Sequence, residues 1–395
     1  MASEYNNKAF VSKAERNRKK EKRKSNISAG LIIRRTLLSL FTIIICAVIA
    51  LFACLYVVVN GECEPLRDRL VLSAMQASAT KWLPGLFMSQ DTVDEIVAAS
   101  YVVNTDVMSL DEYASIMAEN TTTVTEDMWK NAIDGMIFET IHGNTFTGYL
   151  LLVKDPSRLY VGTSSDFKQG LKGINIFTMA EKSDAVAIIN GGEFSDPGGQ
   201  GDGNNPLGLT YSKGECVWND SYKRTFIGFD KNDRLIVTEP MTKKKADELG
   251  IRDAVCFQNG NVLITNENGN ISIHYSDNNT GTAQRTAIGQ AEDGTVILLV
   301  TDGRSASSLG ATKNDVIDVM IKYGAVTAGM LDGGSSSLMY YEDYFTKFDY
   351  DIEKLDQYQK KGLVNKYKAF TPPRRIPTFF CVAKETNEGE VSKGE

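Results

Sequence analysis

The sequence predicts an α+β fold, a mixed β-sheet core with flanking helices, preceded by a transmembrane helix and a helical stalk. Residues 37–59 form an apolar run, residues 60–135 carry apolar side chains at helical spacing, and β-branched runs between Gly, Asn and Asp turns follow Gly135. These three observations divide the 395 residues into a basic cytoplasmic tail (1–36), a transmembrane helix (37–59), a helical stalk or cap (60–135), a main domain (136–385) and a flexible tail (386–395).

The run from Leu37 to Val59 holds 23 residues without a charge. At 1.5 Å per residue it covers a hydrocarbon core of about 30 Å. Residues 1–35 contain eleven Lys and Arg against three Glu, a net charge of +8, so the rest of the chain carries −15 of the total of −7. The positive-inside rule then predicts a single-pass protein of the cell membrane, in contact with lipid through Leu37–Val59, with a cytoplasmic N-terminus and an extracytoplasmic main domain.

This N-terminal region has two alternative interpretations, a cleaved signal peptide and a nucleic-acid-binding segment. A cleaved signal peptide has an apolar region of about 7–15 residues and a small-residue cleavage site, and Val59-Asn60-Gly61-Glu62 offers no such site. The basic run would also suit nucleic acid, but beside a membrane span, topology and anionic lipid explain it more simply. No nucleic-acid partner is expected, and the sequence leaves the oligomeric state open.

Residues 60–135 are interpreted as a spacer between membrane and main domain. Ser109 and Glu112 have the spacing of a capping box ahead of Tyr113 and Ile116, which predicts a helix start. Among the six cysteines there is no C-x-x-C spacing, and a Cys216–Cys256 disulfide is one possibility.

In the main domain, one hairpin and one helix are the clearest elements. Asp293-Gly294 joins two apolar runs and predicts a type I′ turn. Thr312 or Asn314 begins a helix that Gly324 ends, and the chain then enters a strand at 325–331. The further predicted strands are Tyr149–Val153, Ala185–Ile189, Thr225–Phe229, Leu235–Thr238, Val262–Thr265, Ile271–His274, Thr286–Gly289, Val296–Thr301 and Phe379–Ala383.

Four segments share one design, in which an apolar strand runs directly into or out of small and polar residues. They are A-I-I-N-G-G-E-F at 187–194, R-T-A-I-G at 285–289, L-V-T-D-G-R at 299–304 and M-L-D-G-G-S-S-S at 330–337. A buried strand fixes position, and glycines beyond its end allow backbone amides to approach a ligand. One such segment alone indicates a turn, whereas four together indicate a site.

In order and spacing, these segments resemble the phosphodiester glycosidases. The family includes an enzyme that removes N-acetylglucosamine from mannose 6-phosphate, and bacterial members are often described as exopolysaccharide biosynthesis proteins. The resemblance covers about Thr145 to Lys384 and includes P-L-G at 206–208, G-A-T at 310–312 and R-I-P-T at 375–378. It departs from the family at Glu193, where many relatives have Tyr, and in a longer glycine-rich loop at Asp196–Asn205, which would suit a lid.

The resemblance implies a glycosidase that hydrolyses a sugar 1-phosphodiester in a cell-surface glycopolymer or glycoconjugate. Two carboxylates would act as base and as nucleophile or oxocarbenium stabiliser, and an Arg fork would hold the phosphate. The catalytic candidates are Asp302, Asp332 and Glu193. The candidates for binding sugar or phosphate are Asn190, Gly191, Gly192, Arg285, Arg304, Thr312, Gly333, Gly334, Ser335 and Ser336, with Arg375 as an alternative to Arg304.

Other chemistries fit the residues less well. Only His142 and His274 are present, no G-x-S-x-G elbow occurs, and no His cluster has metal-ligand spacing, which disfavours serine hydrolases and zinc phosphoesterases. No cofactor is expected. The oxygen-rich segments at Asp202, Asn204, Asn205 and at Asp277–Asn279 leave calcium open without matching an EF-hand loop. The alternative from another class is a non-catalytic module that binds glycopolymers during exopolysaccharide or cell-wall assembly.

Overall fold

The structure is a computed structural model that describes residues 15, 18, 29–61, 63–75, 80–100, 103–120, 126–164, 167, 171–196, 202–276, 281–305, 308–367 and 371–385. Most of the basic tail, the flexible tail 386–395 and the segment Asp277–Asn279 lie outside these residues. By its internal contacts the chain divides into two compact units, Met1–Arg67 and Asp68–Glu395.

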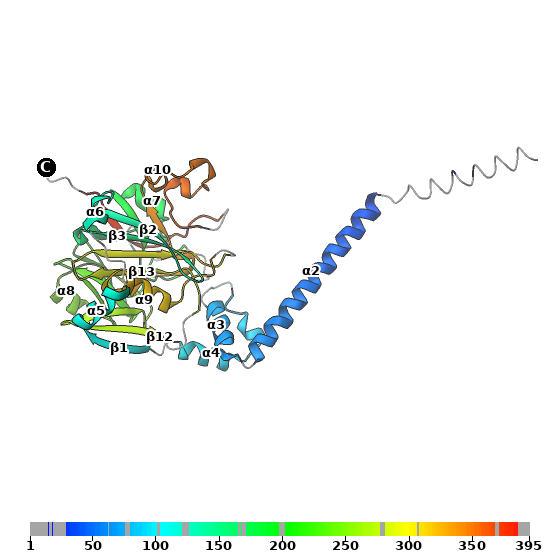
Figure 1. Ribbon diagram of the computed structural model, residues 1–395, viewed down its shortest axis with the longest axis horizontal. Coiled ribbons are helices and arrows are strands. Elements are labelled where there is room, and N and C mark those ends of the chain that lie inside the picture. The colour runs from blue at the N-terminus through cyan, green and yellow to red at the C-terminus, as the bar shows by residue number, and fades with distance from the viewer. Residues whose placement is uncertain are drawn as a thin grey trace, which may run out of the picture. The chain divides into compact units, whose positions relative to one another are not determined.

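The first unit contains the helix α2 (Ala29–Asn60), drawn blue in Figure 1. Its part from Leu31 to Asn60 is long and apolar enough to cross a membrane, and no residue of its most apolar stretch is buried. A membrane anchor and a signal sequence near the N-terminus both have this form.

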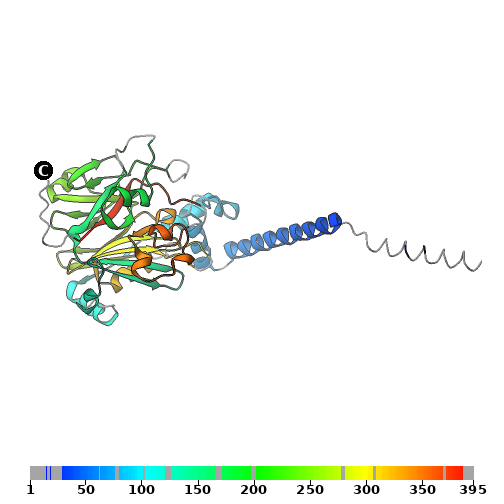
Figure 2. The ribbon, with the colours of Figure 1, turned by 90° about the horizontal axis from the view of Figure 1, so that it is seen from above.

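The second unit is built on three sheets, whose strands run from cyan to red in Figure 1. The largest has eight strands in the order β1 (Val103–Ser109), β12 (Asn270–Ser276), β11 (Val262–Glu267), β15 (Ala325–Met330), β13 (Thr286–Ala291), β14 (Val296–Thr301), β3 (Thr147–Val153) and β2 (Met136–His142). A four-stranded sheet has the order β16 (Met339–Tyr341), β5 (Ala185–Asn190), β17 (Thr378–Ala383) and β4 (Leu159–Thr163), and β17 is the red strand of Figure 2. A five-stranded sheet has the order β7 (Glu215–Trp218), β6 (Thr210–Ser212), β10 (Ile251–Phe257), β8 (Thr225–Asp230) and β9 (Leu235–Thr238).

Short helices flank these sheets. They are α3 (Glu64–Met75), which continues from the first unit, α4 (Gln90–Ala99), α5 (Leu110–Asn120), α6 (Glu126–Lys130), α7 (Ile176–Lys182), α8 (Lys243–Leu249), α9 (Lys313–Lys322) and α10 (Tyr344–Lys347). Single 3-10 turns occur at η1 (Pro84–Leu86), η2 (Pro156–Arg158), η4 (Gly334–Ser336), η5 (Ile352–Lys354) and η6 (Gln359–Lys361). The α+β class with flanking helices is therefore confirmed.

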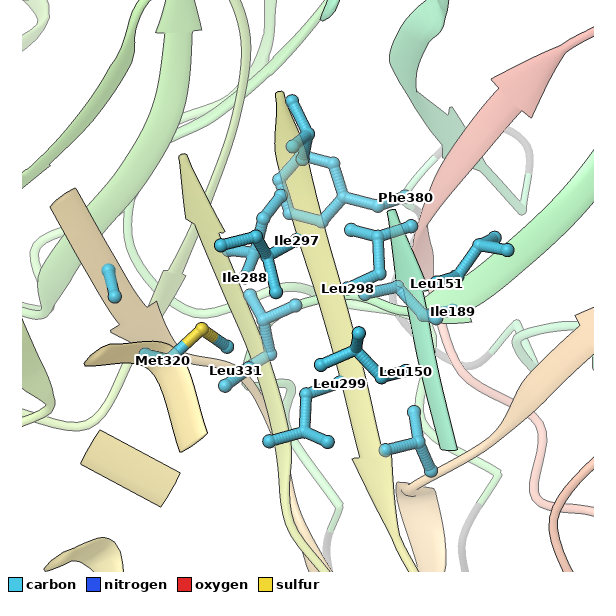
Figure 3. Packing of buried hydrophobic residues seen from close by; sticks show 14 of the residues in the cluster. Leu150, Leu151, Ile189, Ile288, Ile297, Leu298, Leu299, Met320, Leu331 and Phe380 are labelled. Atoms are coloured by element: carbon cyan, nitrogen blue, oxygen red, sulfur yellow. The ribbon is translucent and has the colours of Figure 1, made fainter. Parts of the chain in front are cut away.

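One hydrophobic core joins the three sheets, because strands at their centres are buried on both faces. All six residues of β14 are buried, and Figure 3 shows Leu298 beside Leu151 and Ile189, with Ile297 beside Ile288. Phe380 of β17 meets Phe229 of β8 edge to face at 6.3 Å, which connects the four-stranded and five-stranded sheets. Such strands read as continuous apolar runs rather than alternating ones, as the sequence of β14 does.

The predicted helix and strands of the main domain are confirmed. Helix α9 begins after Thr312, whose Oγ1 accepts the amide of Asp315 while the Asp315 carboxylate accepts the amide of Thr312, so the two form a capping box. Gly324 follows its last turn with a φ of 84°. All nine strands predicted before and after it overlap observed strands.

Three expectations differ from the structure. The segment 60–135, expected to be helical, contains β1, which pairs antiparallel with β12 at the edge of the large sheet. Its polar Asn104, Thr105 and Asp106 hide the strand pattern. The Asp293-Gly294 hairpin forms, but Gln290 pairs with Val296 and the Gly294 amide donates to the carbonyl of Ala291, a pairing that a two-residue turn at Asp293-Gly294 would not give. Of the two turn residues only Gly294 has a positive φ, of 92°, so the turn is not type I′. Every described strand pair is antiparallel where a mixed sheet was expected, because α9 carries the chain past β13 so that β14 and β15 flank it on either side.

Cys216 and Cys256 are free thiols in the structure, and the disulfide considered for them is absent. The Cys256 thiol points at the carbonyl of Leu209, 3.2 Å away.

Candidate active site

The strand ends that carry the polar motifs meet at one edge of the sheets. In the large sheet, the register pairs Ala287 with Met330, Thr286 with Val300, and Thr301 with Gly148, so the segments at 282–285, 302–305 and 331–337 leave from the same end. The amide of Asp332 donates to the carbonyl of Gly191 at 3.2 Å and joins this end to β5 of the four-stranded sheet. We call this end of the sheets the site edge.

A cluster of charged side chains lies at the site edge around Asp332. Arg374 donates through Nη1 to Ser336 Oγ at 3.1 Å and through Nη2 to Asp196, and Ser336 hydrogen-bonds to Asp332. Glu193 lies close enough to act on Asp332 electrostatically and accepts Arg224 Nε at 2.5 Å. The two carboxylates therefore share one environment with two guanidinium groups.

The carboxyl of Asp332 has an unusual acidity. Burial raises its pKa to about 6, and the negative charge of Glu193 adds to the increase, while hydrogen bonding from Ser336, the Arg374 charge and the Gly333 amide oppose it. A carboxyl whose pKa lies near neutral, at a strand end beside a second carboxylate, is suited to acid–base or nucleophilic work.

Asn190, predicted to bind sugar or phosphate, makes four hydrogen bonds to protein atoms. Its Oδ1 accepts Thr286 Oγ1 at 2.8 Å and the Leu338 amide at 3.1 Å. Its Nδ2 donates to the carbonyl of Asp332 at 2.7 Å and, more weakly, to that of Gly191 at 3.4 Å. An amide side chain has two donor and two acceptor positions, so these contacts occupy all four, and Asn190 positions Asp332 instead of a ligand.

The predicted glycines allow backbone segments to approach each other closely. A Cβ on Gly191 would lie 2.7 Å from the carbonyl oxygen of Thr378, and one on Gly192 would lie 2.3 Å from that of Cys256. The Gly192 amide donates to Thr378 Oγ1 at 3.2 Å. These glycines hold Glu193 against β10 and β17 and leave no amide of Gly191 or Gly192 pointing at a ligand, since the Gly191 amide donates to Thr378 O.

The two predicted phosphate-binding arginines differ in their surroundings. Arg285 is buried, donates through Nε to the carbonyl of Ala311 and through Nη2 to that of Gly281, and has a pKa lowered to about 10 by burial and by the charge of Arg304. Arg304 is exposed, and its Nη1 lies 3.7 Å from the position of a Cβ on Gly334. Within the described part of the chain, no hydrogen bond or ion pair engages the Arg304 guanidinium.

Arg304 also has a left-handed backbone, with a φ of 56°. Non-glycine residues adopt this conformation at a cost of about 1–3 kcal/mol, and such outliers concentrate at functional sites. The hydrogen bond from the Arg304 amide to the carbonyl of Leu309, at 3.1 Å, stabilises this backbone conformation. The result is a guanidinium presented beside the Gly333-Gly334 turn.

Asp302 is buried at the end of β14, and its carboxylate is occupied by protein donors. Tyr149 donates its hydroxyl to Oδ2 at 2.9 Å, and the amide of Lys366 donates to Oδ1 at 3.0 Å. Burial raises the pKa of Asp302, and both hydrogen bonds oppose the increase. These contacts connect the large sheet to the segment that leads to Arg374.

The remaining predicted residues divide between structural and accessible positions. Thr312 is buried as the cap of α9. The Gly333 amide donates to Asp332 Oδ1 at 2.9 Å, and the Gly334 amide donates to the carbonyl of Gln284 at 2.9 Å. Ser335 is half-buried, and its carbonyl accepts the Tyr367 hydroxyl at 3.1 Å.

The glycine-rich loop proposed as a lid lies partly outside the described residues, at 197–201. Its second part is tied down: Lys172 Nζ donates to Asp202 at 2.6 Å and Ser164 to Asn204 at 2.5 Å. Arg375 lies 3.9 Å from Asp202. Over the described ranges, no group of three or more His, Cys, Asp or Glu side chains is placed to hold a metal ion.

Three charged residues of this cluster, Arg374, Arg224 and Asp196, were not among the predicted site residues. Arg224 and Asp196 lie in turn-like segments without a motif, and their charges acquire meaning only through Glu193 and Arg374. Arg374 had a detectable signal, because it stands between Pro373 and the R-I-P-T segment.

The chain is similar to several known proteins. Residues 183–383, just over half of the chain, match a family model described as phosphodiester glycosidase. The curated "SPbeta prophage-derived uncharacterized protein YomE" of Bacillus subtilis is 45% identical over 53 residues, which is 13% of this chain and 8% of that relative.

Two solved structures are similar over most of the chain. The zebrafish N-acetylglucosamine-1-phosphodiester alpha-N-acetylglucosaminidase catalytic domain, auto-inhibited by its pro-peptide, is 16% identical and aligns over 73% of this chain and 91% of its own, with a TM-score of 0.46. A putative exported protein of Burkholderia pseudomallei is 15% identical over 74% and 88% of the two chains, with a TM-score of 0.41.

Proposed function

Because the chain belongs to the phosphodiester glycosidase family, we propose that it hydrolyses a sugar 1-phosphodiester of the N-acetylglucosamine phosphate type, with Asp332 and Glu193 as the catalytic carboxylates. The observation that carries this proposal is the raised pKa of Asp332, about 6, beside Glu193. A glycopolymer or glycoconjugate of the cell surface is the expected substrate, and the chain needs no cofactor for this chemistry.

The leaving group decides what the site must supply. When the bond between the anomeric carbon and the phosphate oxygen breaks, the phosphate monoester leaves with the electron pair and is stable without a proton. A cation is then more useful than a strong acid. Arg304 is suited to this role, since its guanidinium lies beside Gly334 and is exposed.

Water supplies the oxygen that replaces the phosphate on the anomeric carbon, and its proton passes to a carboxylate. Asp332 acts in its ionised form, either by accepting that proton or by bonding to the carbon first. Glu193, held by Arg224 at 2.5 Å, supplies the second negative charge that stabilises an oxocarbenium-like transition state. Ser336 and Arg374 orient Asp332, and Asp302 acts as a positioning residue through Tyr149 and the Lys366 amide.

The apolar helix α2 supports a location at the membrane. With the net charge of +8 in residues 1–35, the proposed topology has the N-terminus in the cytoplasm and the sheet domain outside.

The test is incubation of the full-length protein in detergent with methyl N-acetylglucosamine 1-phosphate and measurement of free sugar. Asp332→Asn and Glu193→Gln are each expected to lower turnover on the order of 10²-fold or more with folding intact. Asp202→Asn, a carboxylate whose side chain pairs with Lys172, is the control and should retain turnover. Wild-type rates in both Asp332→Asn and Glu193→Gln would reject the catalytic assignment, and binding without any sugar release would support the glycopolymer-binding alternative.

A further inference from the structure

Three large apolar side chains are exposed within the first residues of the unit 68–395. Leu70 of α3 is 38% exposed, Trp82 is 62% exposed and Leu86 of η1 is 53% exposed. Trp82 follows Lys81, and a Trp beside a Lys with neighbouring leucines is the composition found where proteins meet the headgroup region of a bilayer. We call Leu70, Trp82 and Leu86 the apolar edge.

The covalent chain limits how far the start of the unit 68–395 can lie from the end of α2. Only residues 61–67 separate Asn60 from the unit that begins at Asp68. Seven residues span at most about 25 Å when fully extended. If α2 crosses a membrane, Asp68 therefore stays within that distance of the end of α2, and Leu70 of α3 follows two residues later.

The same helix is bound to the site edge. Ser73 Oγ accepts the amide of Thr282 at 3.1 Å, and a Cβ on Gly281 would lie 2.3 Å from the amide nitrogen of Ser73, so the two backbones are in direct contact. Two residues beyond Thr282, the carbonyl of Gln284 accepts the amide of Gly334. Two residues span about 7 Å, so α3 lies close to the turn that follows Asp332.

Figures 1 and 2 agree with this contact. In both views α3 and α4, in light blue, lie beside one end of the sheets instead of along their faces. The described strand ends at that side include the start of β13, which the segment Gly281–Arg285 directly precedes.

A further exposed apolar side chain lies next to the phosphate-binding candidate. Leu309 is 57% exposed, and its carbonyl accepts the amide of Arg304. Gly310 packs on the backbone of Ala283, since a Cβ on Gly310 would lie 2.5 Å from the carbonyl oxygen of Ala283. The backbone therefore connects Arg304 both to the exposed Leu309 and to the segment that contacts α3.

We propose that the apolar edge lies on the membrane surface and that the substrate is a sugar 1-phosphate esterified to a membrane lipid alcohol. This inference rests on the proposed function and names its substrate class. Hydrolysis releases free sugar and leaves the phosphate monoester on the lipid. Leu309 contacts the first methylenes beyond the phosphate, and insertion of Trp82 and Leu86 holds the site edge at the depth of the headgroups.

The first experiment measures membrane contact without using activity. The full-length protein is reconstituted in phosphatidylcholine vesicles with brominated acyl chains, and tryptophan fluorescence is compared between wild type and Trp82→Phe. Because Trp129 and Trp218 contribute to both spectra, the difference reports Trp82 alone. This difference should be quenched by the brominated lipid, and no quenching would overturn the membrane contact.

The second experiment compares two substrates that differ only in the alcohol, the dodecyl and the methyl ester of N-acetylglucosamine 1-phosphate, in the same vesicles. Trp82→Ser with Leu86→Ser should lower kcat/KM on the dodecyl ester by about tenfold or more, because two apolar side chains no longer insert into the bilayer, and leave the methyl ester unchanged. Val217→Ser with Ile352→Ser replaces exposed apolar residues elsewhere and should change neither.

The outcomes separate the two proposals. No release from either ester by the wild type defeats the proposed function, while the quenching result still decides the membrane contact. Equal kcat/KM for both esters in every variant defeats the lipid substrate and leaves the glycosidase proposal standing. Loss on both esters in the edge variant would show a structural role for the apolar edge and overturn the inference.

Discussion

The raised pKa of Asp332 predicts how kcat/KM depends on pH, and two substitutions should shift this dependence in opposite directions. If the ionised form is active, kcat/KM should fall below the pKa of about 6. At pH 5 about one molecule in eleven is ionised and at pH 7 about ten in eleven, so the rate at pH 5 should be roughly tenfold lower than at pH 7. The pH profile of kcat/KM on methyl N-acetylglucosamine 1-phosphate measures this.

The neighbours of Asp332 should move this acidic limb in opposite directions. Arg374 lowers the pKa of Asp332, so Arg374→Ala moves the limb to higher pH, whereas Glu193 raises it, so Glu193→Gln moves the limb to lower pH in its residual activity. Arg375→Ala is the matched control, since Arg375 lies near Asp202 at 3.9 Å and does not act on Asp332. A limb that stays in place in both variants, or moves the same way in both, would refute the assignment of the limb to Asp332.

Three further predictions concern stability and binding. Because the folded-state pKa of Asp332 lies above its unfolded value, the wild type loses stability as pH rises from about 4 to about 6. Asp332→Asn should therefore raise the free energy of unfolding by about 1–3 kcal/mol at pH 7 and leave it unchanged near pH 3.5. A pH-independent difference in urea titrations would contradict this. Asn190→Ala leaves the buried Thr286 hydroxyl and Leu338 amide without an acceptor, which should cost about 2–5 kcal/mol in the same titrations; an unchanged midpoint with lost activity would return Asn190 to a ligand-binding role. Arg304→Ala should raise KM for the phosphodiester and leave the melting temperature within a degree or two, because the exposed guanidinium supports no described contact; a large loss of stability with unchanged KM would move phosphate binding elsewhere.

Strand ends were predictable from the sequence because the strands at the centre of the sheets are buried on both faces. The runs that became β5 and β14 are apolar up to their last residues, Asn190 and Thr301, so the pattern marks where each strand ends. Edge strand β1 is exposed on both faces from Thr105 to Val107 and has polar residues at its centre, so its pattern resembles that of a loop. A pattern that depends on burial cannot reveal a strand that is only partly buried.

Side-chain direction was the part of the site that the sequence could not supply. Asn190, Arg285 and Asp302 stand at the predicted strand ends, but their polar groups are satisfied by protein atoms. A motif places the Cα of a residue, whereas its role depends on which partners fill its hydrogen-bonding positions. Those partners, such as Leu338 for Asn190 and the Lys366 amide for Asp302, come from segments far away in the chain.

The segment D-G-R at 302–304 shows how one motif combines these requirements. The Asp302 carboxylate accepts hydrogen bonds from the Tyr149 hydroxyl and the Lys366 amide, so it links the end of β14 to the segment that precedes Arg374 in the chain. Gly303 has no side chain because a Cβ there would lie 2.8 Å from the amide nitrogen of Gln284, whose carbonyl in turn holds the turn after Asp332. Arg304 then takes a strained φ of 56° that brings its guanidinium beside Gly334. A side chain at 303 would push these backbones apart and would move Arg304 away from the turn that follows Asp332. Close packing, and not flexibility, is therefore the reason for a glycine at this position.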